Sequence, residues 1–219
     1  MLRQSLFSIA LLLLSNCAVA SEVMPGEKGK FIVELGPIEL GELNIDSTCN
    51  DTTCFYRARA KGSFMFIGAD VNEKGSYMRE GERVVPISTD YQEKIGSKEK
   101  AYSYDFVGKE IQNKRKDELI ELPENAYTFM PLLNQVLLDL LNGGPKPEYE
   151  YLSKHKHRTA LITNYTKKTT DDGVMHRFIG RQKDKDKKNK KVVFYFLQKG
   201  DFIGLQKVSY GGFYLTRVD

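Results

Sequence analysis

The chain has 219 residues, of which 41% are hydrophobic and 28% are charged, a composition that excludes a disordered or fibrous protein. A formal net charge of +4 is too small to indicate a nucleic-acid-binding protein. With three histidines and three cysteines, the chain has few residues for metal binding or nucleophilic catalysis.

Residues 1–20 have the features of a secretory signal peptide. Arg3 supplies a thin positive start, residues 6–14 are apolar, and Ala18 and Ala20 form an A-x-A cleavage pattern. The apolar stretch is shorter than the roughly 20 residues that span a membrane. The sequence therefore predicts a signal peptide at 1–20 and a single exported β-rich domain at 21–219, located in the periplasm or secreted. The alternative is a lipoprotein anchored through Cys17, because residues 14–17 resemble a lipobox.

Two cysteines remain once the signal peptide is removed, Cys49 and Cys54. An even number of cysteines in an exported chain indicates a disulfide bond. The Ser, Asn, Asp and Thr residues around them favour a tight loop between two strands. A redox-active or metal-binding pair is the less favoured interpretation, because no further cysteine and no nearby histidine completes such a site.

Most of the remaining chain is predicted to form short strands separated by turns. In residues 101–107, for example, Tyr102, Tyr104 and Phe106 alternate with other residues and share one face. Residues 114–122 are mostly polar and are typical of an exposed or edge strand. The other predicted strands are 31–35, 38–45, 54–61, 63–69, 76–79, 83–91, 149–153, 158–165, 174–181, 192–197, 202–209 and 213–218.

Residues 127–141 break this pattern and predict one amphipathic helix of three to four turns. Thr128 is a suitable N-cap, and the glycines and proline at 143–145 end the helix. Asn134, Gln135 and Asp139 lie outside the apolar stripe. The stripe consists of Leu132, Leu133, Val136, Leu137, Leu140 and Leu141. We expect the stripe to pack on one face of a curved sheet, and a sharper hypothesis is that the helix plugs or gates a cavity for an apolar ligand.

Residues 63–67 and 192–197 are apolar on both faces, so we expect both faces of these strands to be covered. Ordinary core packing explains this, and a lipid-sized cavity is the functional alternative. The candidate cavity residues are Leu133, Val136, Leu137, Leu140, Phe64, Phe66, Phe194 and Phe196.

Residues 181–191 read RQKDKDKKNKK and account for the positive surplus of the whole chain. A solvated hairpin tip is the simplest interpretation. The functional one is an anionic partner, such as a lipid headgroup, an acidic glycan or an acidic protein face. The candidate residues for such a partner are Arg181, Lys183, Lys185, Lys187, Lys188, Lys190 and Lys191.

Catalytic signatures are scarce in this sequence. It has no G-x-S-x-G, H-E-x-x-H or phosphate-loop motif, so an enzyme is not favoured and no catalytic residue is assigned. His155 and His157 have the spacing to chelate a metal from one strand face, but three adjacent cations disfavour a divalent ion. We therefore predict no metal site and no cofactor.

Several stretches resemble a family of bacterial periplasmic proteins, the domain-of-unknown-function family 3108. The hairpin at 36–43, which reads GPIELGEL, is similar to the early hairpin of that family, and the leucines at 132–141 are similar to its mid-chain helix. Residues 202–208 take the place of one of its last strands but lack the family's proline. The resemblance implies a curved antiparallel sheet wrapping a helix, as in periplasmic lipoprotein carriers, and it assigns no catalytic residues.

These features together predict a mainly β fold, a strongly curved antiparallel sheet or partial barrel with one amphipathic helix packed on the concave face. The predicted function is non-catalytic binding of an amphiphile or envelope component, which is a lipid, a lipoprotein or a glycolipid. The alternative is an envelope protein-interaction or scaffold factor that uses the basic hairpin, and a hydrolase is the least favoured class. Neither nucleic acid nor insertion into the membrane after signal cleavage is expected.

Overall fold

A computed structural model describes residues 27–50, 52–64, 67–183 and 191–219, with only the backbone at Phe64. The predicted signal peptide, including Cys17, lies outside these ranges. Within them, no helix has both the length and the apolar character needed to cross a membrane.

The described strands form one antiparallel sheet of 14 strands, and a helix separates them into two runs along the chain. The strands before the helix are β1 (Gly29–Leu35), β2 (Ile38–Asn50), β3 (Thr53–Phe64), β4 (Ile67–Glu80), β5 (Arg83–Ile95), β6 (Lys98–Asp105), β7 (Glu110–Asn113) and β8 (Glu118–Glu121). The helix is α2 (Phe129–Leu141). The strands after it are β9 (Glu148–Ser153), β10 (Lys156–Thr170), β11 (Gly173–Gln182), β12 (Lys191–Lys199), β13 (Phe202–Tyr210) and β14 (Phe213–Arg217).

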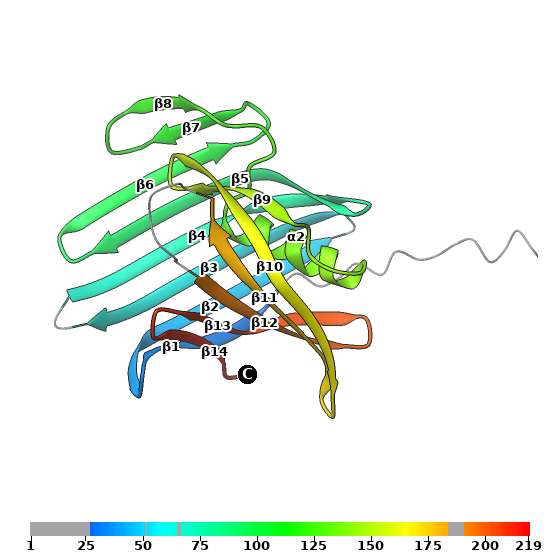
Figure 1. Ribbon diagram of the computed structural model, residues 1–219. Helices are drawn as coiled ribbons and strands as arrows, with labels where there is room; N and C mark the ends of the chain where they lie inside the picture. Colours follow the sequence, from blue (N-terminus) through cyan, green and yellow to red (C-terminus); the bar gives the residue numbers. More distant parts are fainter. Residues whose placement is uncertain (1–26, 51, 65–66, 184–190) are drawn as a thin grey trace, which may run out of the picture.

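The first and last strands join the two runs into a continuous sheet. Within each run, consecutive strands pair with each other. In addition, β1 pairs with β14, and Phe31 lies opposite Arg217. The two edge strands, β8 and β9, do not pair with each other, so the sheet stays open. The sheet curves so that its two halves lie on either side of α2 (Figure 1). The predicted fold class, a curved antiparallel sheet with one helix, is confirmed.

The main core lies between α2 and the inner face of both halves of the sheet. Leu137 of the helix packs in one cluster with Ile45 of β2 and Phe178 of β11, all of which are almost completely buried. Period-two alternation along the strands places these apolar side chains on the inner face. Burial of this apolar surface, at about 25 cal/mol per Å², is the main force that holds the helix inside the sheet.

Two predicted strands are wrong in detail. Residues 63 and 64 end β3 and residues 67–69 begin β4, with Phe64 paired to Ile67, and Ile67 is 54% exposed. The expectation that both faces of residues 63–67 are covered therefore fails at Ile67. Residues 114–122 contain a turn at 114–117 followed by β8, which is an edge strand as expected.

The polar side of α2 is buried as well as its apolar stripe. Gln135 accepts a hydrogen bond from the backbone N–H of Val84 at 2.7 Å and donates one to Asp139 at 2.9 Å. The hydroxyl of Tyr149 donates to Asp139 at 2.8 Å. Helical periodicity alone leaves these polar residues facing water. In the folded chain, β5 and β9 pack against that side of the helix. Gln135 and Asp139 form their hydrogen bonds with Val84 of β5, with Tyr149 of β9 and with each other.

The opening between the sheet edges is bridged near the start of α2. Tyr127 pairs with Tyr151 of β9 in a short parallel bridge. The hydroxyl of Tyr104 in β6 donates to the backbone carbonyl of Lys154 at 3.1 Å, and the ammonium of Lys154 donates to Glu93 of β5 at 2.9 Å. The turn between β9 and β10 is thereby attached to the opposite half of the sheet.

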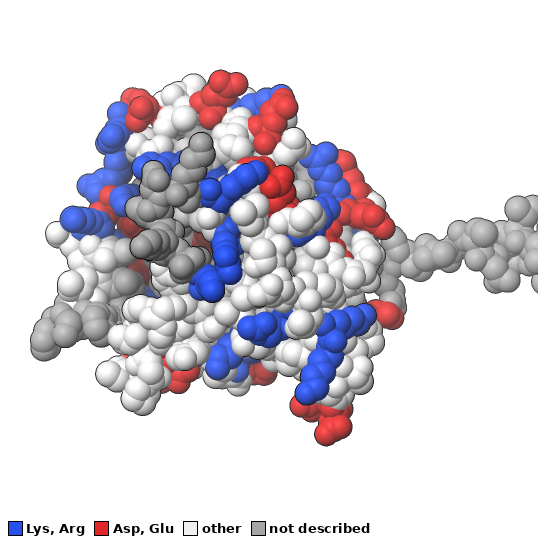
Figure 2. All heavy atoms as spheres, in the orientation of Figure 1, with Lys and Arg blue, Asp and Glu red and all other residues white. Residues whose placement is uncertain are grey.

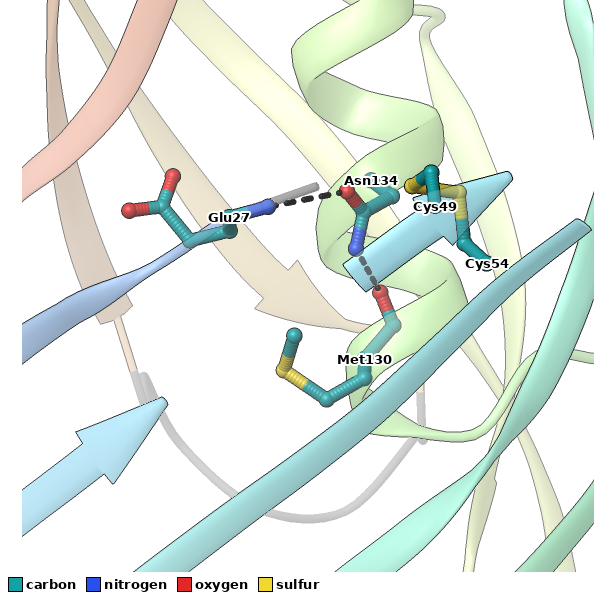
Figure 3. The surroundings of a disulfide bond; sticks show 5 residues. All are labelled: Glu27, Cys49, Cys54, Met130 and Asn134. Atoms are coloured by element: carbon teal, nitrogen blue, oxygen red, sulfur yellow. Dashed lines mark hydrogen bonds between the residues drawn. A yellow bond between two sulfur atoms is a disulfide. The ribbon is translucent and has the colours of Figure 1, made fainter. Parts of the chain in front are cut away.

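The Cys49–Cys54 disulfide is present, as predicted, and connects the ends of β2 and β3 beside α2. On this side of the helix, Figure 3 shows the backbone N–H of Glu27 donating to the side chain of Asn134 at 3.4 Å. Asn134 in turn donates to the carbonyl of Met130 at 2.9 Å. The residues preceding β1 are therefore attached directly to the helix.

Candidate functional site

A pocket of about 530 Å³ lies between the first turns of α2 and the two halves of the sheet. This volume is within the range of small-molecule sites, roughly 300–1,000 Å³. One wall comes from β4, β5 and β6, and the other comes from β9 to β13. The lining residues are Glu73, Tyr91, Tyr104, Thr128, Phe129, Leu132, Tyr151, Leu152, Ser153, Lys154, Ala160, Gly180, Arg181, Gln182, Val192, Phe194 and Tyr210.

The apolar wall of the pocket depends on stacked aromatic rings. Phe194 of β12 packs against Phe178 at 5.2 Å between ring centroids, and Phe178 packs against Phe196 at 5.6 Å. Gly180 lies beside Phe194, and a Cβ atom at Gly180 would be 3.0 Å from the Phe194 ring. The missing side chain at Gly180 therefore leaves space for the Phe194 ring at the edge of the pocket.

The polar end of the pocket is the carboxyl group of Glu73, which comes from β4 and is only 7% exposed. Its Oε1 atom accepts hydrogen bonds from the backbone N–H of Met130 at 3.1 Å and from the hydroxyl of Tyr56 at 3.4 Å. Thr128 occupies the N-cap position, but its side chain makes no capping hydrogen bond. Glu73 therefore satisfies a free N–H group at the start of α2 from across the molecule.

A chain of hydroxyl groups supports Glu73. The Tyr56 hydroxyl lies 2.7 Å from the hydroxyl of Thr89, which lies 3.0 Å from that of Thr128. Tyr56 reaches this position because Gly75 has no side chain. A Cβ atom at Gly75 would be 2.8 Å from the Tyr56 hydroxyl oxygen. Gly75 is thus needed to bring Tyr56 close to Glu73.

Burial dominates the electrostatics of Glu73. It raises the pKa of the carboxyl group to about 7, although the hydrogen bonds from Met130 and Tyr56 act in the opposite direction. In the part of the chain that the structure describes, no cationic side chain forms an ion pair with Glu73. Burial also raises the pKa of Tyr56 and Tyr104 above the usual range, so both hydroxyls stay protonated and can only share neutral hydrogen bonds.

Of the predicted cavity residues, Phe194 lines this pocket. Five others, Leu133, Val136, Leu137, Leu140 and Phe196, are buried in the main core. Most of the stripe is used for core packing, and the pocket uses only its first residue, Leu132, together with Phe129. Phe64 is the last residue of β3, at the end of the β3–β4 hairpin, and its side chain is not described. Phe66 is outside the described residues.

The described part of the basic segment lies at the ends of β11 and β12. Arg181 is opposite Lys191 in the sheet, and Lys183 forms an ion pair with Glu148 at 3.3 Å. Arg181 borders the pocket, and its Nε atom is buried without a hydrogen-bond partner among the described residues. In Figure 2, Lys and Arg side chains cross the middle of the visible face, and acidic side chains lie mainly near its outline. Lys185, Lys187, Lys188 and Lys190 are outside the described ranges.

The two spaced histidines have separate partners. His155 is in the turn after β9, where its Nδ1 lies 3.3 Å from the Tyr102 hydroxyl. His157 lies 2.9 Å from a carboxylate oxygen of Glu150. Because His155 is in a turn, the strand spacing that made H-x-H a candidate chelator does not apply. Within the described ranges, no group of three or more His, Cys, Asp or Glu residues is arranged to hold a metal ion.

Glu73 is the main site residue that the sequence reasoning missed. The strand prediction begins at residue 76, whereas β4 begins at Ile67. If the alternation of side chains is extended back to Ile67, Glu73 lies on the same face as Gly75. A bulge between Ser76 and Tyr77 shifts the register of the residues that follow. A lone acidic residue on an inner face was the available signal.

Comparison with known proteins gives no further information on the site. No family model, curated protein or solved structure matches this chain. The resemblance to family 3108 therefore stays a prediction.

Proposed function

We propose that this protein is an exported, non-catalytic binding protein for an amphiphile of the cell envelope, held in the pocket between α2 and the sheet. The observation that carries the proposal is the pocket itself, which has apolar walls from Leu132, Leu152 and Phe194 and a few polar groups at its ends. Pockets of this kind hold ligands with an apolar body and one polar end.

The disulfide supports the exported location, because such bonds persist in oxidising compartments. Periplasmic location or secretion follows from the predicted signal peptide, and anchoring through Cys17 is the alternative.

Binding is tested by titrating delipidated protein with N-phenyl-1-naphthylamine, a fluorescent apolar probe, and displacing it with fatty acid, lysophospholipid or a lipopeptide. The Ala160→Leu variant adds bulk to the pocket wall and is expected to weaken probe binding about tenfold or more. The matched control is Ala101→Leu on β6, which makes the same change outside this pocket and leaves binding unchanged. Absence of probe binding in the wild type, or equal effects of both variants, overturns the proposal.

A second candidate is an interaction factor that binds an acidic partner through the basic segment. The facing positions of Arg181 and Lys191, with Lys183 next to them, favour this alternative. A pull-down from envelope extract compares the wild type with a Lys183→Gln/Lys191→Gln variant. The control is Lys94→Gln, on another strand. Selective loss of captured acidic proteins in the double variant supports the interaction role, and unchanged capture refutes it.

A further inference from the structure

Glu73 is an unusual lining residue for a pocket with apolar walls. Its carboxyl group faces the pocket and is almost completely removed from bulk water. The hydrogen bonds that it accepts from Met130 and Tyr56, at 3.1 and 3.4 Å, both end on Oε1. An apolar chain placed there removes the remaining water from the carboxyl group, and this costs much more for the ionised form than for the protonated form.

The groups that face Glu73 do not neutralise its charge. Tyr56 from β3, Tyr91 from β5, Tyr104 from β6 and Thr128 before the helix present neutral hydroxyl groups. Thr89 from β5 lies between the hydroxyls of Tyr56 and Thr128. The helix contributes backbone N–H groups, from Met130 and the residue before it. The cations that line the same pocket are used elsewhere or lie apart: Lys154 pairs with Glu93 at 2.9 Å, and Arg181 forms no ion pair with Glu73.

We propose that the occupant of the pocket binds together with a proton on Glu73, so that Glu73 couples ligand affinity to pH. This inference rests on the proposed function, because it concerns the same pocket and the same class of ligand. The proton comes from solvent and returns to it on release, and no covalent bond to the ligand is made. The ligand is held most tightly below neutral pH and is released as the pH rises.

The raised pKa of Glu73, about 7, places this coupling near neutrality. If the ligand binds only the protonated form, its apparent affinity falls about tenfold for each pH unit above that pKa and is nearly constant well below it.

The test measures the dissociation constant of N-phenyl-1-naphthylamine from about pH 5.5 to about pH 8.5, a range in which this probe does not titrate. We expect the affinity of the wild type to fall at least tenfold over this range. The Glu73→Gln variant carries a permanent neutral amide and is expected to bind the probe with the same affinity at every pH.

The matched control is Glu27→Gln. Glu27 is another buried carboxyl group whose pKa burial raises to about 7, but it lies against Arg217 and is not among the pocket residues. This variant keeps the pH dependence of the wild type if the inference is correct. Isothermal titration in two buffers of different ionisation enthalpy gives a second readout, the uptake of up to one proton per probe bound near pH 7.5.

The outcomes separate the inference from the function it rests on. Probe binding that is independent of pH in the wild type, or a pH dependence that survives in Glu73→Gln, overturns the inference and leaves the amphiphile-binding function intact. No binding at any pH overturns the proposed function. Loss of the pH dependence in Glu27→Gln contradicts the assignment to Glu73.

Discussion

Two buried glutamates, Glu27 and Glu73, lie on different sides of α2 and have the same raised pKa of about 7, but they have different partners. Glu27 forms an ion pair with Arg217 at 2.8 Å and accepts the backbone N–H of Leu205 at 3.2 Å. Glu73 has no cation among the described residues and instead accepts the N–H of Met130 at the start of the helix. Glu27 is not among the residues that line the pocket, whereas Glu73 is.

This difference shows how two carboxyl groups whose pKa values are raised to the same extent can have different roles. At Glu27 the buried charge has an ionic partner, so this residue, which precedes β1, is joined to the last residue of β14. At Glu73 the ionised form has only dipoles around it, so protonation is the simplest way to relieve the cost of burial. A buried acid without a cation, next to a pocket, is a candidate for function.

The largest expected effect comes from removing the cation beside Glu27. The Arg217→Met variant leaves that carboxyl group buried without its ion pair. We expect a loss of about 3 kcal/mol in the free energy of unfolding at pH 8. Urea denaturation measures it. The loss is smaller at pH 5, where Glu27 is protonated. An equal loss at both pH values contradicts the ionic role assigned to Arg217.

The raised pKa values of both glutamates predict that the protein is less stable at pH 8 than at pH 5. A carboxyl group whose pKa is about 7 when folded and 4.5 when unfolded holds its proton more tightly in the folded state. Its contribution to stability is therefore fully present below pH 4.5 and is lost as the pH rises through 7. The loss is at most about 3 kcal/mol for each group. Urea denaturation at both pH values checks this, and Glu73→Gln and Glu27→Gln should each remove part of the difference.

Removing the disulfide tests the Glu27 side of α2. Replacing Cys49 and Cys54 by alanine is expected to cost about 2 kcal/mol, because the short loop between them gains freedom in the unfolded chain. Thermal unfolding of the variant measures this cost. The probe affinity at pH 6 should not change, because neither cysteine lines the pocket. A large loss of affinity contradicts the separation of the two sides.

The smallest expected effect is at the N-cap of the helix. An N-cap side chain normally contributes about 1 kcal/mol, but the side chain of Thr128 makes no capping bond. The Thr128→Ala variant removes the hydrogen bond with Thr89 but no capping bond, so we expect it to lose about 1 kcal/mol in urea denaturation. A loss well above that value would show that Thr128, and not Glu73, holds the start of the helix.

The sequence allowed correct prediction of features that depend on neighbouring residues. The leucine stripe identified the helix, and the paired cysteines identified the disulfide. The alternation in β6 and the continuous apolar run of β12 identified strands. The short turns between strands indicated antiparallel pairing. The curvature of the sheet around the helix followed from the need to cover the apolar stripe.

Features that depend on distant residues were not predictable in this way. Glu73 meets Met130 across 57 positions in the chain, and Glu27 meets Arg217 across 190. The stripe was expected to pack on the sheet, and four of its residues were also cavity candidates. All four lie in the core, because periodicity shows which face is covered and does not show what covers it. The pocket forms where β9 approaches β5 and β6 beside the start of α2, and this position depends on the curvature of the sheet.

The most direct test of the account is a crystal structure of the protein with an alkyl amphiphile brominated at the end of its chain. Anomalous scattering locates the bromine without reference to the rest of the ligand. The account predicts one strong peak inside the pocket, between Leu132 and Phe194. A bound ligand whose bromine lies outside this pocket, or a pocket that holds only water at saturating ligand, contradicts it.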